Sequence, residues 1–213
     1  PLANPHINRP LIVTNGKGIK IQEENGDWWT DAHSSYMSVN IGYGRNEMAE
    51  VAAKESLKLN LYPPQSIGLP TIDLANKLVK ISPGQMSKVF FTSSGSEANE
   101  TAIKLTKSYF HRTGETNRFK IVSRRGSYHG ATMGLSPIGF EHLEPDQTIF
   151  PQFPTNVYVP LPVPSNCEFG ATSPDECTQK CIDATKETIL SNNPETIAAF
   201  IAELIPTRPG AAI

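Results

Sequence analysis

Two short segments carry residues whose types and spacing suit the binding of an anion and a flat ring. The first is Ser93-Ser94-Gly95-Ser96, four small residues between an apolar run and a stretch with helical spacing. Ser94 followed three residues later by Glu97 is a capping-box pattern, so we expect a helix with Ser94 as its N-cap. The unpaired amides and positive dipole of a helix start attract phosphate, and small side chains allow it to approach. A capped turn without a ligand has the same spacing and stays an alternative.

The second segment is Tyr128-His129-Gly130, which follows the apolar run at residues 119–123. Loops that follow neighbouring parallel strands gather at one edge of the sheet, where ligands bind, so we expect this segment near the first. A tyrosine ring beside a phosphate site could stack on a flat ring. Taken singly, Tyr128 is also compatible with a core position, and His129 with a structural hydrogen-bonding role.

Other ligand-binding signatures are absent from the sequence. The pairs Gly16/Gly18 and Gly42/Gly44 lack the third glycine of a dinucleotide fingerprint, and no Gly-Lys-Ser/Thr triplet of a P-loop occurs. Cys177 and Cys181 are four residues apart on an expected helix, but two thiols without a nearby histidine do not make a zinc site. We therefore expect no metal site, and we expect all three cysteines to be reduced.

The strands and helices that must position these segments can be predicted from the spacing of apolar residues. Alternation around Asn25-Gly26 predicts a hairpin with a two-residue turn over residues 18–32. Helical spacing predicts helices over 45–59 and from Thr71 to the Pro83-Gly84 stop. Further along, apolar segments alternate with expected helices that begin near Ser96, Ala131 and Pro174; these segments are predicted strands at 88–92, 119–123, 156–159 and 196–204.

This order predicts an α/β fold with a mostly parallel sheet flanked by helices. We expect two parts: residues 1–62 form an N-terminal hairpin and helix segment, and residues 63–213 belong to a larger α/β domain. The proline-rich stretch between Pro137 and Pro174 is interpreted as a long connection rather than a boundary, because strands and helices alternate again after it.

Composition excludes several classes of partner. The chain has 213 residues, of which 38% are hydrophobic and 19% charged, with a formal net charge of −2. That balance gives no electrostatic case for nucleic acid, and the longest apolar runs are too short to span a bilayer. Reduced cysteines favour a reducing compartment, so we expect a cytoplasmic protein, with a mitochondrial location not excluded.

Three segments together resemble the class III aminotransferases, which bind pyridoxal 5'-phosphate (PLP) on a fold-type I scaffold. Residues 24–50 are similar to the family's N-terminal hairpin and first helix, 89–110 to its phosphate loop and helix, and 123–134 to its ring-stacking segment. The resemblance implies a fold-type I transferase that moves an amino group from an amine or ω-amino acid to a keto acid. It also implies a homodimer.

The resemblance assigns roles to individual residues. It implies that the Ser94, Gly95 and Ser96 loop holds the cofactor phosphate, that Tyr128 stacks on the pyridine ring, and that His129 lies beside it. It places Glu203 near the ring hydroxyl and the substrate side. It also implies that Leu61 and Tyr62 border the substrate pocket. A solvated carboxylate at a strand end is the alternative for Glu203.

The sequence departs from the family pattern in three places. Leu204 stands where the family usually has proline, and Tyr43 where many members have histidine. The family's aspartate for the pyridine nitrogen and its Schiff-base lysine have no counterpart after Glu203. The chain is therefore expected to correspond to the N-terminal half of such an enzyme, with no catalytic lysine and no turnover alone.

Two other functions stay open at this point. Relatives of the family perform aminomutase, racemase or decarboxylase reactions on the same cofactor. The chain is also compatible with a non-catalytic PLP-binding or scaffold protein that keeps the phosphate loop without the lysine.

Overall fold

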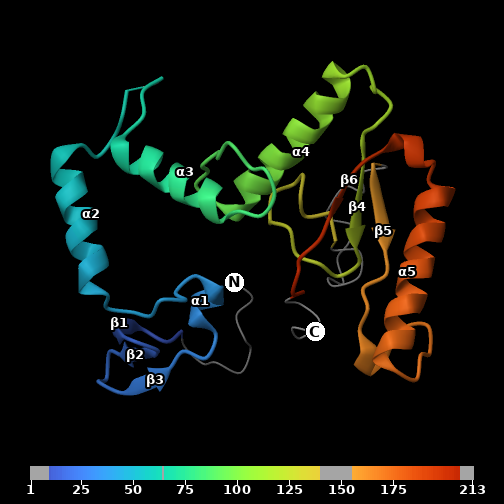
Figure 1. Cartoon of the computed structure of the whole chain (residues 1–213). Helices are drawn as coiled ribbons and strands as arrows, with labels where there is room; N and C mark the ends of the chain where they lie inside the picture. Colours follow the sequence, from blue (N-terminus) through green and yellow to red (C-terminus); the bar gives the residue numbers. More distant parts are fainter. Residues whose placement is uncertain (1–9, 64, 140–154, 207–213) are drawn as a thin grey trace. The chain divides into compact units, whose positions relative to one another are not determined.

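The computed structural model describes residues 10–63, 65–139 and 155–206 (Figure 1). The chain forms two compact units, Pro1–Lys88 and Val89–Ile213, and each is described by itself. The domain boundary that the sequence predicts, between residues 62 and 63, stays a prediction. No helix in the described ranges is long and apolar enough to cross a membrane.

The first unit opens with a three-stranded antiparallel sheet. Its strands are β1 (Val13–Lys17), β2 (Lys20–Glu23) and β3 (Trp28–Thr30), in the order β1-β2-β3. The hairpin predicted around Asn25-Gly26 is confirmed as β2 and β3, but the two-residue turn is wrong. Only Gly26 of the pair has a positive φ, of 94°. The Asn25 side chain instead accepts a hydrogen bond from the Asp27 amide at 2.9 Å, and this Asx turn widens the loop.

Two regular helices follow in the same unit. They are α2 (Asn46–Lys58) and α3 (Leu69–Ile81), and both confirm the helices predicted from apolar spacing. The third helix begins before the expected Thr71 because proline is favoured in the first turn of a helix. The short element α1 (Ser34–Met37) is a left-handed turn, since all four of its residues have positive φ.

The second unit is built on a parallel sheet. Its strands are β4 (Lys120–Arg124), β5 (Asn156–Val159) and β6 (Ile197–Ile201), in the order β5-β4-β6. Three of the four predicted strands are therefore confirmed, and β4 lies at the centre. Two short 3-10 helices, η2 (Pro164–Asn166) and η3 (Pro194–Thr196), lie in the connections.

One long helix packs on each face of this sheet (Figure 1). On one face, Ile103 of α4 (Gly95–Arg112) packs against a buried cluster of Ile121, Leu135 and Ile138. On the other, Ile189 of α5 (Pro174–Ser191) packs against Val122, Val157 and Val159. Because neighbouring residues of a strand point to opposite faces, the continuous apolar run of β4 fills both layers.

Two predicted elements of this unit are wrong. Residues 88–92 form no strand, and within the described residues no strand pairs with them; Phe90 is 72% exposed. A strand needs a neighbour for its hydrogen bonds, and periodicity does not supply one. The helix expected near Ala131 is a series of turns over 131–139, in which Pro137 disfavours helix and its carbonyl accepts a hydrogen bond from the Tyr158 hydroxyl.

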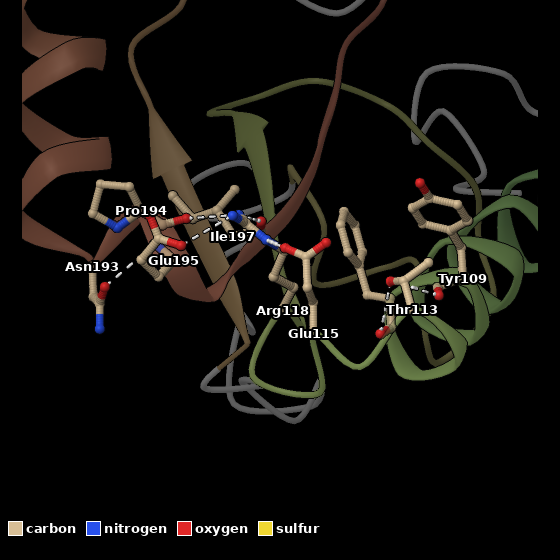
Figure 2. Close-up of polar contacts among 9 residues, drawn as sticks. Tyr109, Thr113, Glu115, Arg118, Asn193, Pro194, Glu195 and Ile197 are labelled. Atoms are coloured by element: carbon tan, nitrogen blue, oxygen red, sulfur yellow. Dashed lines mark hydrogen bonds and ion pairs between the residues drawn. The ribbon is translucent and has the colours of Figure 1, made fainter.

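A half-buried guanidinium joins the segments that lead into β4 and β6 (Figure 2). Arg118 donates from Nη1 to the carbonyls of Pro194, at 3.2 Å, and Ile197, at 3.1 Å. Its Nε pairs with Glu115 at 2.5 Å, and its guanidinium carbon lies 5.5 Å from the Phe110 ring centroid. The side chain therefore fixes where β6 begins beside the central strand.

We predict that Arg118→Ala lowers the melting temperature of the full-length protein by about 2–4 °C or more, because two backbone carbonyls lose their charged donor. Arg118→Lys should recover only part of the loss, since an ammonium cannot form the same fork. The matched control is Arg112→Ala at the exposed end of α4. Equal melting temperatures for the Arg118 and Arg112 variants would contradict this role.

Candidate functional site

The start of α4 forms an open backbone cradle. Ser94 is the N-cap, as predicted, and its hydroxyl oxygen accepts a hydrogen bond from the Glu97 amide at 3.2 Å. The Glu97 carboxylate accepts from the amide of Ser93, at 2.7 Å, rather than from Ser94 as in the standard capping box. The amides of Ser93 and Glu97 therefore both have acceptors, and the turn is stable without a ligand.

Two amides of this first turn remain available to an anion. Within the described residues, no group accepts a hydrogen bond from the N–H of Gly95 or Ser96. A Cβ added at Gly95 would have nothing within 4 Å, so the space in front of the backbone is open. Unpaired amides at the positive end of a long helix, approached through open space, are the features of a phosphate site.

The loop that follows β4 is fastened to the first two turns of α4. The Asn99 side chain donates to the His129 carbonyl at 2.7 Å, and the Ser96 hydroxyl accepts from the Ala131 amide at 3.2 Å. One turn further on, Thr132 donates to the Glu100 carboxylate at 2.5 Å. Because the Ser96 hydroxyl only accepts in this contact, its proton is still free for a bound anion.

Gly130 makes this contact sterically possible. Its φ is 141°, and an added Cβ would lie 2.6 Å from Leu135 Cδ1 and 2.8 Å from Ser96 Oγ. No side chain therefore fits between the loop and the helix without moving one of them.

Tyr128 and Glu203 are brought together by the parallel pairing of β4 with β6. The Tyr128 amide donates to Glu203 Oε2 at 3.0 Å, and the Glu203 carbonyl accepts from Arg124 Nη1 at 3.1 Å. The Tyr128 side chain is 44% exposed, so its ring offers a surface to a ligand. The carboxylate of Glu203 is half-buried and holds the loop, which removes the alternative of a solvated strand end.

His129 is buried and held in one tautomer. Its Nε2 lies 2.9 Å from Ser127 Oγ, and that hydroxyl gives its single proton to the Arg124 carbonyl at 2.6 Å. The imidazole must therefore donate from Nε2, which leaves Nδ1 as the acceptor. Burial lowers the pKa of His129, with a smaller contribution from the Arg124 charge, and the charge of Glu203 opposes it. The ring is accordingly held neutral.

The structure gathers six of the predicted site residues in one unit: Ser94, Gly95, Ser96, Tyr128, His129 and Glu203. Leu61 and Tyr62 belong to the other unit, where the Tyr62 hydroxyl lies against Gly68, so their role in a substrate pocket stays a prediction. Lys104 and Lys107 are exposed on α4, more than two turns from the cradle, as expected of surface lysines.

Several residues that build the site were not predicted. Asn99 and Glu100 connect the cradle to the loop through contacts between segments distant in the chain. Ser127 holds His129 within the loop. One local signal was available in the sequence. Asn99 and Glu100 lie about one turn after the N-cap of an amphipathic helix, and their polar side chains are suited to hold a neighbouring loop.

Comparison with known proteins shows that the chain is similar to aminotransferases. Residues 2–213 match the family model described as aminotransferase class-III. A probable aminotransferase of Mycobacterium tuberculosis, Rv3329, is 37% identical, and the match covers 96% of this chain and 45% of that protein. The putrescine–pyruvate aminotransferase of Pseudomonas aeruginosa is 33% identical, with 95% of this chain and 44% of that protein covered.

The chain is also similar to solved structures of transaminases. The ω-transaminase of Pseudomonas jessenii in complex with PMP superposes with a TM-score of 0.89 at 29% identity, covering 96% of this chain and 45% of that one. A transaminase solved with L-alanine superposes with a TM-score of 0.87 at 32% identity, covering 97% and 46%. The fold-type I assignment is confirmed, and the chain spans about half the length of the proteins it matches.

We predict that Gly130→Ala destabilises the protein by about 1–3 kcal/mol more than Gly114→Ala, measured by urea unfolding of the full-length protein. Both glycines have positive φ, of 141° and 85°, but an added Cβ at Gly114 meets nothing within 4 Å, so Gly114→Ala is the control for an alanine at positive φ without a steric contact. Equal losses in the two variants would show that the loop does not press on α4 at Gly130.

Proposed function

Because the chain belongs to the class-III aminotransferase family, we propose that the protein containing these residues is a PLP-dependent aminotransferase. Its reaction would transfer an amino group from an amine or ω-amino acid to a keto acid. The observation that carries the proposal is the open pair of amides at Gly95 and Ser96 within a chain that matches the family over nearly its whole length.

The residues present fit the cofactor at two points. The phosphate requires hydrogen-bond donors in a positive field, and the start of α4 offers two amides and the hydroxyl protons of Ser94 and Ser96. The pyridine ring requires a flat apolar neighbour, and the half-exposed ring of Tyr128 supplies one. When bound, PLP supplies the electron sink that lets an amino group leave one carbon and join another.

The chain's own residues would mainly bind and orient. Charged hydrogen bonds from the amides and hydroxyls would anchor the phosphate, at about 1.5–3 kcal/mol for each bond to a charged group. Tyr128 would fix the plane of the ring. Glu203 would position Tyr128 by holding its backbone amide. His129 would stay neutral and would therefore add no positive charge to the site.

The lysine that binds the cofactor's aldehyde and moves protons is proposed to lie outside residues 1–213. The lysines on the described helices are exposed or paired, as Lys180 is with Glu176 at 2.8 Å, and Lys120 of β4 donates to the Asn192 carbonyl at 2.7 Å. On this proposal the chain supplies the phosphate and ring half of the site and has no turnover alone.

We also propose a homodimer in the cytoplasm. Large apolar side chains are exposed in the first unit, among them Leu57 at 90%, Leu61 at 78% and Leu69 at 75%. Apolar surface of this extent favours association, and symmetric dimers are the commonest solution. The cytoplasmic location rests on the free cysteines.

We expect light scattering of the full-length protein at micromolar concentration to give twice the subunit mass. Leu57→Asp should shift the equilibrium toward monomer, because a charge would have to be buried in the contact. Lys54→Asp on the same exposed helix is the control for added charge. A monomer with full activity would contradict the proposal.

We predict that Gly95→Val in the full-length protein causes loss of most PLP during gel filtration, because a branched side chain fills the space in front of the cradle amides. Occupancy is read from cofactor absorbance, and turnover with an amine donor and a keto acid should fall in parallel. Ala102→Val, exposed on the same helix two turns later, is the matched control.

Unchanged occupancy in Gly95→Val would contradict the placement of the phosphate. Full occupancy in the unaltered protein, without amino transfer to any of a panel of keto acids, would instead contradict the aminotransferase activity and favour a binding protein.

A further inference from the structure

Two arginines stand next to each other at the end of β4, and their side chains make different contacts. Arg125 Nη1 pairs with the Glu168 carboxylate at 3.1 Å, and these two side chains are 40% and 43% exposed. Arg124 Nη1 instead donates to the backbone carbonyl of Glu203 at 3.1 Å, across a separation of 79 residues in the chain. Because the two arginines are adjacent and have the same side chain, a variant of one is a matched control for a variant of the other.

The side chain of Arg124 lies on the face of the sheet that α5 covers. Neighbouring residues of a strand point to opposite faces. In β4, Ile121 belongs to the cluster against which α4 packs, and Val122 belongs to the cluster against which α5 packs. Arg124 is two residues after Val122 and therefore shares the α5 face, whereas the phosphate cradle is part of α4. The guanidinium is thus placed to act on the site through other residues rather than by touching a phosphate held there.

Arg124 continues the connection between β4 and β6 beyond the end of their paired residues. The last pair of the two strands is Ser123 with Ile201. Past that pair, the guanidinium connects the two segments by donating to the Glu203 carbonyl. A hydrogen bond from a charged donor is roughly twice as strong as one between neutral groups. The chain after β6 is therefore fixed to β4 at the residue whose carboxylate reaches the site.

The contacts of Arg124 and Tyr128 form a closed circuit of hydrogen bonds. On one side, the Arg124 guanidinium holds Glu203, whose Oε2 accepts from the Tyr128 amide at 3.0 Å. On the other side, the Arg124 carbonyl accepts from the Ser127 hydroxyl at 2.6 Å and from the Ser127 amide at 3.3 Å. Ser127 directly precedes Tyr128 in the chain. The backbone of Tyr128 is therefore held from both sides by contacts that start at Arg124.

We propose that Arg124 is a positioning residue for the ring of the cofactor. It holds the Glu203 backbone, the Glu203 carboxylate holds the Tyr128 amide, and the half-exposed Tyr128 ring then presents one fixed face for stacking. This inference rests on the proposed function, because it requires a flat ring beside Tyr128. The bonds of Asn99 and Ser96 to the loop do not involve Arg124, so loss of its side chain leaves the phosphate cradle in place. Orientation of the ring and retention of the phosphate are therefore separable.

The contact made by Arg124 matters more to the site than its charge. Burial is the largest cause that lowers the pKa of His129, the charge of Glu203 opposes it, and the charge of Arg124 contributes least. Removal of the Arg124 charge therefore leaves the imidazole neutral. Arg124→Lys keeps the charge but lacks the rigid planar fork of a guanidinium, so it should restore only part of the positioning.

The test uses the full-length protein loaded with PLP. PLP is not chiral, so its visible circular dichroism arises only where the surrounding residues fix the ring in one orientation. Arg124→Gln should keep most of its PLP through gel filtration but lose most of this signal per bound PLP. With an amine donor and a keto acid, its kcat should fall about tenfold, as expected for one lost hydrogen bond from a charged donor, with little change in KM. Arg125→Gln, which removes only an exposed ion pair, should keep both the signal and kcat.

A second background tests the route through Glu203. In Glu203→Ala the link to the Tyr128 amide is absent, so adding Arg124→Gln should cause little further loss of signal. The inference is overturned by equal signals per bound PLP in Arg124→Gln and Arg125→Gln, or by an undiminished effect of Arg124→Gln in the Glu203→Ala background. If Arg124→Gln does not fold, Arg124→Lys is compared with Arg125→Lys by the same criteria. An unaltered protein that holds no PLP would contradict the proposed function, and this inference with it.

Discussion

The site depends on the contact between the first two turns of α4 and the loop that follows β4. Three hydrogen bonds cross it: Asn99 to the His129 carbonyl, the Ala131 amide to Ser96, and Thr132 to Glu100. The two neutral bonds contribute about 0.5–1.5 kcal/mol each, and the bond to the Glu100 carboxylate contributes about 1.5–3 kcal/mol. Together with the close packing at Gly130, they hold the phosphate cradle and the Tyr128 ring as one surface.

The parallel sheet supplies the other half of this arrangement. Because β4 lies between β5 and β6, the loops that leave β4 and β6 emerge at the same edge, and Glu203 reaches the Tyr128 amide. Arg118 fixes the entry into both strands at the opposite end. The fold therefore places the ligand-facing groups at one edge of the sheet. Other side chains, such as Asn99 there and Arg118 at the opposite end, fasten the segments together, so that the site keeps free donors and an exposed ring.

Local signals predicted the parts of the site that are locally determined. The Ser94 cap, the boundaries of α2 and the start of α5 at Pro174 follow from residues within one or two turns, and the structure confirms them. The failures share a different cause. Residues 88–92 needed a strand partner, and the turns at 131–139 are fixed by Tyr158 from another strand. Contacts of this kind cannot be predicted from the spacing of apolar residues along the sequence.

The central claim is that these residues hold the phosphate and ring of PLP while the reactive lysine comes from outside them. The most direct test is to reduce the PLP-loaded full-length protein with borohydride and map the pyridoxyl label by mass spectrometry. The account predicts one lysine labelled stoichiometrically, at a position outside residues 1–213, with Lys104 and Lys107 unlabelled. Stoichiometric label on a lysine within these 213 residues, together with amino transfer, would contradict it.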